Sequence, residues 1–188
     1  MGDPSQVIRH GMFIMPFHDP AKPPGQCYDE DLELVVRAEE LGITEFWVGE
    51  HHTMQYETVV MPEIFIARAL GVTRRMRLGP APVCLQQHHP AHVAARLAFL
   101  DHLAKGRLNL AFGPGSVTAD QELYGLDPKD AAAMTEAAVE VILKLWASDP
   151  PTEIGGAGSP KDSPDPRGQP PHLHRVGVTH STSAWPEA

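Results

Sequence analysis

The hydrophobic positions of this chain of 188 residues alternate between two spacings. Short apolar runs, typical of buried strands, occupy residues 11–15, 45–49, 77–85 and 107–112. Each run is followed by a segment whose apolar residues recur every three or four positions, as in an amphipathic helix: residues 29–41, 62–70, 90–105 and 131–146. Regular alternation of strand and helix predicts an α/β fold with a parallel sheet.

Helix boundaries and buried stripes can also be predicted. Asp29 stands where an N-cap of the first helix would lie, and Pro62 and Pro90 suit the first turns of the next two. We expect these positions to face the core: Leu32, Val35 and Val36 in the first helix, Val93, Leu97, Leu100 and Ala104 in the third, and Met134, Ala138, Val141 and Leu145 in the fourth.

Four strand-helix units amount to half of a TIM-type (β/α)8 barrel, which needs eight units and about 250 residues. After Trp146 the composition becomes rich in proline, glycine, serine and histidine. We therefore predict two regions: residues 7–148, the N-terminal half of a barrel, and residues 149–188, a disordered tail. Such a truncated barrel leaves two sheet edges open, so we expect a poorly stable chain or one that dimerises through those edges.

Composition narrows the function classes. With 42% apolar and 21% charged residues the chain can bury a core, and its net charge of -9 argues against binding nucleic acid. No apolar run reaches 18 residues, so we expect no membrane span. Two cysteines, Cys27 and Cys84, are too few for a disulfide framework, which predicts a reducing, cytoplasmic location.

Candidate chemistry lies where the second strand ends, at Glu50, His51 and His52. The C-terminal ends of barrel strands carry the active-site loops, and imidazole exchanges protons near neutral pH. Because the two histidines are adjacent, we expect their side chains to point in opposite directions.

Three more histidines, His88, His89 and His92, follow the third strand. A metal site is one interpretation, but few carboxylates accompany them, so we favour helix capping and ligand-lining roles and predict no metal. Asp120 alone would be interpreted as a solvated loop carboxylate.

Two backbone features could also shape a ligand site. Gly113 and Gly115, after the fourth strand, would let the backbone approach a ligand closely. The Ala81-Pro82 bond is a candidate cis peptide that would form a flat ledge for a planar ring.

Together these segments resemble the luciferase-like flavin monooxygenases. The resemblance extends from the first strand to about residue 155 and is strongest in Phe46 to His52, Met61 to Ala69, Leu78 to Pro90, Phe99 to Arg107 and Phe112 to Gly125. Pro62 to Ala69 and Leu78 to Val83 are most similar to the limonene monooxygenase-like members.

The resemblance implies a barrel that holds a reduced flavin, FMN first, with FAD or a deazaflavin as alternatives. The flavin would react with O2 to give a C4a-peroxide that oxygenates a small apolar substrate. A flavin reductase would supply the reduced flavin, and the protein would be a homo-oligomer. The implied catalytic residues are His51 and Asp120. Implied cofactor-binding residues are Glu50, Ala81, Pro82, Val83, Gly113 and Gly115.

Two departures from the family pattern leave alternatives open. Pro114 stands where bacterial luciferases place an arginine for the flavin phosphate, and the fifth to eighth units are missing. The change after Gly156 suggests a shifted reading frame or an early stop. A metal-dependent barrel hydrolase and a non-catalytic remnant therefore remain alternative functions.

Overall fold

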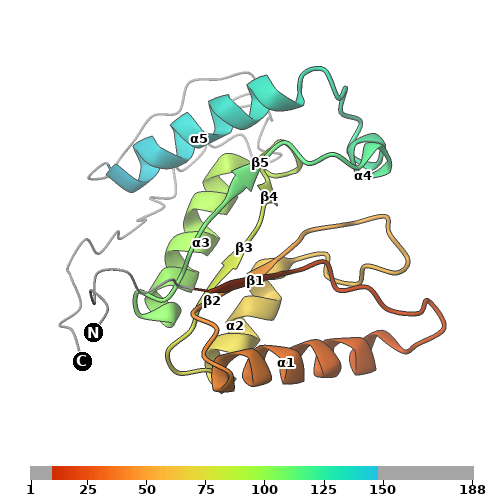
Figure 1. Ribbon diagram of the computed structural model, residues 1–188. Helices are drawn as coiled ribbons and strands as arrows, with labels where there is room; N and C mark the ends of the chain where they lie inside the picture. The colour runs from red at the N-terminus through yellow and green to blue at the C-terminus, as the bar shows by residue number, and fades with distance from the viewer. Residues whose placement is uncertain (1–9, 148–188) are drawn as a thin grey trace, which may run out of the picture.

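The structure is a computed structural model that describes residues 10–147. Strands and helices alternate through it, and the predicted tail of residues 149–188 lies outside the described residues (Figure 1). The elements are β1 (Gly11–Ile14), α1 (Pro24–Glu40), β2 (Glu45–Val48), α2 (Pro62–Val72), β3 (Arg77–Pro80), β4 (Val83–Cys84), α3 (Pro90–Ala104), β5 (Phe112–Gly113), α4 (Thr118–Leu123) and α5 (Ala131–Ala147).

The strands are parallel, as predicted. β1, β2 and β3 form one sheet in that order, with Phe13 opposite Trp47 and Trp47 opposite Gly79. β4 and β5 form a second parallel pair. The chain is therefore an α/β protein whose strands all point the same way, so the loops that follow them gather at one end of the sheets.

The predicted third strand is divided by its prolines. β3 ends at Pro80, the Ala81-Pro82 bond is cis, and β4 begins at Val83. Proline has no N–H to donate, so a continuous ladder through residues 80–82 is impossible. Of the fourth predicted strand, residues 107–112, only Phe112 lies in a strand, β5. The preceding residues still run alongside, because Ala111 donates to the Pro80 carbonyl (3.2 Å) and accepts from the Val83 amide (2.8 Å).

The first helix begins earlier than predicted. α1 starts at Pro24, so Asp29 lies inside the helix and the prediction of an N-cap there is wrong. A proline at the first helical position costs little, because its missing N–H would have had no partner in the helix. Leu32 and Val35 are buried as predicted, and the whole predicted stripe of α3 is buried.

The last helix is rotated relative to its predicted stripe. Ala138 is buried, but Met134 is exposed and Ile142, which the pattern did not select, is fully buried. Ile142 packs in one cluster with Val93 and Leu97 of α3. Because α5 packs on α3, the side of α5 that faces α3 decides which residues are buried.

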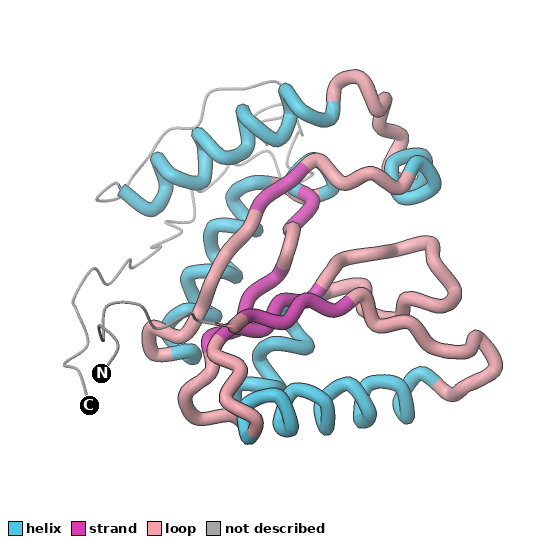
Figure 2. Tube along the Cα trace, in the orientation of Figure 1, coloured by secondary structure: helices cyan, strands magenta, loops and turns pink. Residues whose placement is uncertain are grey.

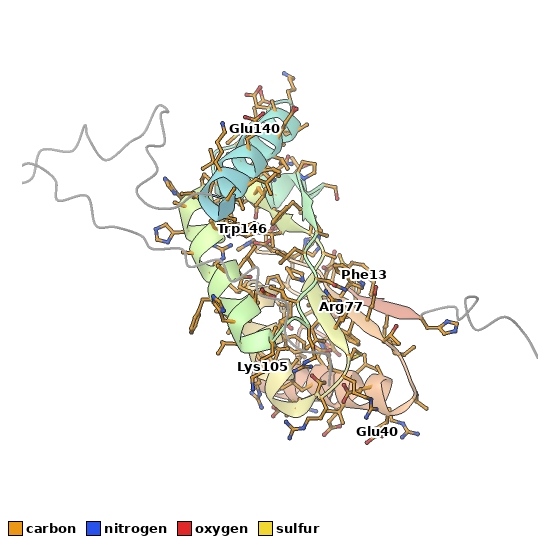
Figure 3. All side chains as sticks on the ribbon, turned by 90° about the vertical axis from the view of Figure 1, so that its left-hand side faces the viewer. Phe13, Glu40, Arg77, Lys105, Glu140 and Trp146 are labelled. Carbon is orange, nitrogen blue, oxygen red and sulfur yellow. The ribbon has the colours of Figure 1, made fainter. Side chains whose placement is uncertain are left out.

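Two side chains tie the N-terminal ends of the strands together. Glu39, at the end of α1, accepts backbone hydrogen bonds from the amides of three residues, Arg74, Arg75 and Met76. Arg107 donates to the carbonyls of Leu70 and Met76. In Figure 3, Glu40 and Lys105 mark this end of the molecule, where α1 and α3 finish. Within residues 10–147, no helix combines the length and apolar composition needed to cross a bilayer.

Candidate functional site

The opposite end of the sheets carries the candidate site. The loops after β1 and β2 extend to the side that also holds α4, as the tube in Figure 2 shows. The Gly49 amide donates to the Ile14 carbonyl (3.1 Å), so the chain leaves β2 still attached to β1. Glu50, His51 and His52 follow directly, at the end of the strands where the sequence predicts chemistry.

At this end of the sheets the Glu50 carboxylate is hydrogen-bonded to three other residues. Its Oε1 lies 2.6 Å from Nε2 of His88 and 3.0 Å from Nε2 of His52, while Oε2 accepts from the Cys84 amide at 2.9 Å. Burial alone would raise the pKa of Glu50, but these hydrogen bonds outweigh it and hold the pKa below its ordinary value. Glu50 therefore stays ionised and links the loop after β2 to β4.

Asp120 is brought to His51 by a helix that the sequence did not predict, α4. Its Oδ2 lies 3.3 Å from Nδ1 of His51. Its Oδ1 accepts from the His52 amide (3.1 Å), the Thr53 amide (2.7 Å) and the Thr53 hydroxyl (2.6 Å). Burial opposes ionisation here as well, but the donors, led by the Thr53 hydroxyl, lower the pKa of Asp120.

The two adjacent histidines turn to different partners, as predicted. His51 faces Asp120, whereas His52 donates from Nε2 to Glu50, and its Nδ1 lies 3.0 Å from the Tyr124 hydroxyl. Since Nε2 of His52 donates, its Nδ1 is the natural acceptor for that hydroxyl. Their side chains are only 14% and 7% exposed, so neither turns outward into solvent.

Sequence reasoning missed one carboxylate of the site. Glu57, in the loop between β2 and α2, places Oε2 at 3.0 Å from Nε2 of His51. Nothing in the spacing of residues 51 to 57 marks it, because the loop folds back on itself: the His51 amide donates to the Val59 carbonyl (3.3 Å). Thr53, in the same loop, and Tyr124, which α4 brings to His52, were also missed.

The Ala81-Pro82 bond is cis, as the sequence suggested, and the segment lies beside the end of β2. The Ala81 amide donates to the Val48 carbonyl at 2.8 Å. A Cβ on Gly113 would lie 3.0 Å from Cβ of Pro82, so the absence of a side chain at residue 113 lets the two segments pack. A backbone approach to a ligand at Gly113 stays a prediction.

Gly115 and Cys84 pack against each other beside this segment. Gly115 has a φ of +64°, and a Cβ there would lie 3.0 Å from the Cys84 sulfur. Burial, with the charges of Glu50 and Asp120, raises the pKa of the Cys84 thiol to about 12, so it is an inert neighbour rather than a nucleophile. Cys84 and Cys27 are both buried free thiols.

The three histidines after β4 have separate roles. His89 caps α3, since its Nδ1 accepts from the Ala91 amide at 3.3 Å, which confirms a capping role. His92 is exposed, and its ring packs edge-on against His89. His88 faces Glu50 instead.

One metal-type cluster exists in the described part of the chain. Ligand atoms of Glu50, His52 and His88 lie within 4.8 Å of one another. The distances of 2.6 and 3.0 Å between Oε1 and the imidazole nitrogens are those of hydrogen bonds. The cluster is thus satisfied internally, although its donor set could also hold a divalent cation.

Comparison with known proteins decides the family. The sequence pattern of the luciferase-like monooxygenases matches residues 8–180, which is most of the chain and extends past residue 155. The chain belongs to the luciferase-like monooxygenase family. It is 42% identical over 144 residues to 4-hydroxyprotoasukamycin monooxygenase of Streptomyces nodosus subsp. asukaensis, covering 77% of this chain and 39% of that protein. It is 40% identical over 153 residues to limonene 1,2-monooxygenase of Rhodococcus erythropolis, covering 81% and 40%.

Solved structures agree on the fold. The monooxygenase RslO1 from Streptomyces bottropensis matches with a TM-score of 0.74 at 30% identity, covering 80% of this chain and 46% of that one. This chain spans about two fifths of the length of the curated relatives it matches. A more distant relative is named the oxygenase component of a flavin-dependent trigonelline monooxygenase, from Acinetobacter baylyi. It is 31% identical, covering 66% of this chain and 35% of that protein.

Proposed function

We propose that this chain is the N-terminal part of a flavin-dependent monooxygenase that inserts one oxygen atom from O2 into a small apolar molecule. The observation that carries this is the buried His51–Asp120 pair at the strand edge that also holds the cis Ala81-Pro82 segment. Glu50 joins the two, because it follows β2 and accepts from the Cys84 amide. Family membership supports the reaction class, since two relatives at 42% and 40% identity are named monooxygenases.

Residue roles follow from this proposal. His51 exchanges a proton with the oxygen that reacts, and Asp120 holds the imidazole in place through Nδ1. A bound reduced flavin would supply the electrons that activate O2. Residues proposed to surround its ring system are Glu50, Ala81, Pro82, Val83, Gly113 and Gly115.

Unsatisfied polar atoms near this segment fit a heterocyclic ligand. Oε1 of Gln86 and Oε1 of Gln87 are buried, with no hydrogen-bond partner among residues 10–147. An isoalloxazine ring carries an N–H donor, and a buried acceptor without a partner is costly until a donor reaches it. The two carbonyl oxygens follow β4 directly, so they favour a flat ligand with N–H groups at this edge.

The architecture of the whole enzyme is part of the proposal. We propose that residues 7–148 form the first four units of a (β/α)8 barrel and that the protein works in the cytoplasm. A separate flavin reductase would supply the reduced flavin, as the name "oxygenase component" of the trigonelline relative suggests.

Flavin binding by this chain tests the proposal directly. Under anaerobic conditions the chain is titrated with reduced FMN, FAD and a deazaflavin, and fluorescence reports binding. We expect one of the three to bind, and His51→Gln, but not the exposed control His92→Gln, to lower oxygenation of limonene by about 100-fold or more when reductase and O2 are present. Failure of all three flavins to bind would overturn the proposal. Oxygenation by this chain as fast as that by a full-length relative would contradict the half-barrel architecture.

The metal-dependent hydrolase keeps one supporting observation, the Glu50–His52–His88 cluster. Elemental analysis after dialysis against zinc and iron separates the two functions. Stoichiometric metal that is lost in His88→Gln would favour the hydrolase.

A further inference from the structure

Glu57 is buried in a place where its charge needs a partner. Its side chain is 5% exposed, and Oε2 lies 3.0 Å from Nε2 of His51. Although Nε2 of His51 lies at ion-pair distance, Oε2 of Glu57 has no hydrogen-bond partner within residues 10–147. A buried carboxylate oxygen is costly without a donor, and the nearest one available is the ring nitrogen of His51.

We propose that Glu57 is a positioning residue for His51. It accepts the proton on Nε2 while Asp120 accepts at Nδ1, so that carboxylates hold the imidazole at both ring nitrogens. The inference rests on the proposed function in one respect, the assignment of His51 as the group that exchanges a proton with the ligand.

Two loops cooperate to place Glu57. It forms an antiparallel bridge with Phe17 in the loop after β1, and the His18 amide donates to the Tyr56 carbonyl (2.8 Å). The rings of Phe17 and Tyr56 stack with centroids 5.2 Å apart. The loop after β1 thus positions the carboxylate that faces His51.

The geometry gives His51 a direction of proton transfer. A carboxylate oxygen lies 3.3 Å from Nδ1 and another 3.0 Å from Nε2, and a ring that donates to both must carry two protons. When an anionic oxygen of a ligand replaces Glu57 at Nε2, that proton moves to the oxygen. A neutral imidazole remains, its other proton is still held by Asp120, and the ligand oxygen becomes a hydroxyl. His51 would then act as an acid rather than a base.

Imidazole NMR of the flavin-free, full-length chain tests this directly. Long-range proton–nitrogen correlation with ¹⁵N-labelled histidine shows which ring nitrogens carry protons. We expect His51 to carry both, with a strongly downfield Nε2–H. Glu57→Leu should remove the downfield signal, and Glu57→Asp should restore it in part. The matched control is Asp31→Asn, because Asp31 pairs with His18 (3.0 Å) in the neighbouring loop and should leave the His51 signals unchanged.

Several outcomes would overturn the proposal. One is a wild-type His51 with an unprotonated Nε2, and another is a Glu57→Leu spectrum identical to that of the wild type. If Glu57→Leu does not fold, Glu57→Gln keeps an acceptor but removes the charge, and should leave only one ring proton. A protonated His51 in a chain that binds no flavin would support Glu57 while refuting the monooxygenase assignment. Flavin binding with an unprotonated Nε2 would do the reverse.

Discussion

The buried carboxylates at this site have no lysine or arginine partner within residues 10–147. Glu50, Glu57 and Asp120 are all nearly inaccessible, and their partners within residues 10–147 are imidazoles, a hydroxyl and backbone amides. Imidazole is a partner whose charge can change, whereas lysine and arginine are fixed cations. A site built in this way can change its charge when the imidazoles gain or lose protons.

The pairing of Glu50 predicts how stability depends on pH. Its pKa in the folded chain is below the ordinary 4.5, so its contribution is fully present above about pH 4.5 and is lost as the pH falls through the folded value. Glu50→Gln should therefore destabilise the chain by about 1–3 kcal/mol at neutral pH, and by progressively less in acid. Urea unfolding across this range measures the difference.

The control for that experiment is Asp29→Asn. Asp29 pairs with Arg68 on the surface, where both side chains are 64% exposed, and such a pair contributes under about 1 kcal/mol. A difference between Glu50→Gln and the wild type that is equally large at acid and neutral pH would contradict the lowered pKa.

Among the elements, α5 shows most clearly how packing overrides a hydrophobic pattern. Ile142 is fully buried against α3, and Met134, two turns earlier on the predicted stripe, is exposed. Both lie inside the same helix, and alanine is a good helix former at either position. A greater cost at Ile142 than at Met134 therefore reports packing, since helix propensity alone would favour the replacement of isoleucine by alanine.

Ile142→Ala should cost about 2–5 kcal/mol of unfolding free energy, because it removes buried methyl groups and leaves a cavity. Met134→Ala should change the stability by no more than about 0.5 kcal/mol. Chemical denaturation of both variants measures these changes in the free energy of unfolding. A larger cost for Met134→Ala would mean that the predicted stripe, and not the observed one, faces the core.

At the scale of the whole molecule, the sheet is open on one side. β1 pairs only with β2 within residues 10–147, and Phe13 on that strand is 52% exposed. In Figure 3 Phe13 and Arg77 lie along the same side of the strands, away from α3. An unpaired strand with an exposed aromatic residue is prone to associate with another chain.

We therefore expect concentration-dependent self-association of the chain, weakened by Phe13→Lys. Sedimentation velocity over a range of concentrations measures it. Phe99→Lys is the comparison, since Phe99 is 66% exposed but lies on α3, away from the sheet edge. Loss of association in Phe99→Lys alone would move the contact from the strand edge to the helices.

Much of this architecture was predictable because it depends on local patterns. Alternating strand and helix periods predicted the parallel α/β arrangement, and the buried stripe of α3 followed from its spacing. His51 and His52 were placed correctly at a strand end, and the different directions of their side chains followed from their adjacency. Family membership rests on the same local segments, which the comparisons confirmed.

The contacts between separate loops could not be predicted from local patterns and were decided by the tertiary structure. Spacing alone left Asp120 a solvated loop carboxylate, and only the family resemblance implied a catalytic role. In the structure α4 brings it within 3.3 Å of His51, 69 positions earlier in the chain. Glu57 carried no signal, because its position depends on a bridge to Phe17. Periodicity records which residues face a core, whereas the partners of a buried charge are fixed by where separate loops meet. The sequence alone therefore determined the elements and the family, and only the folded chain decided which carboxylates surround His51.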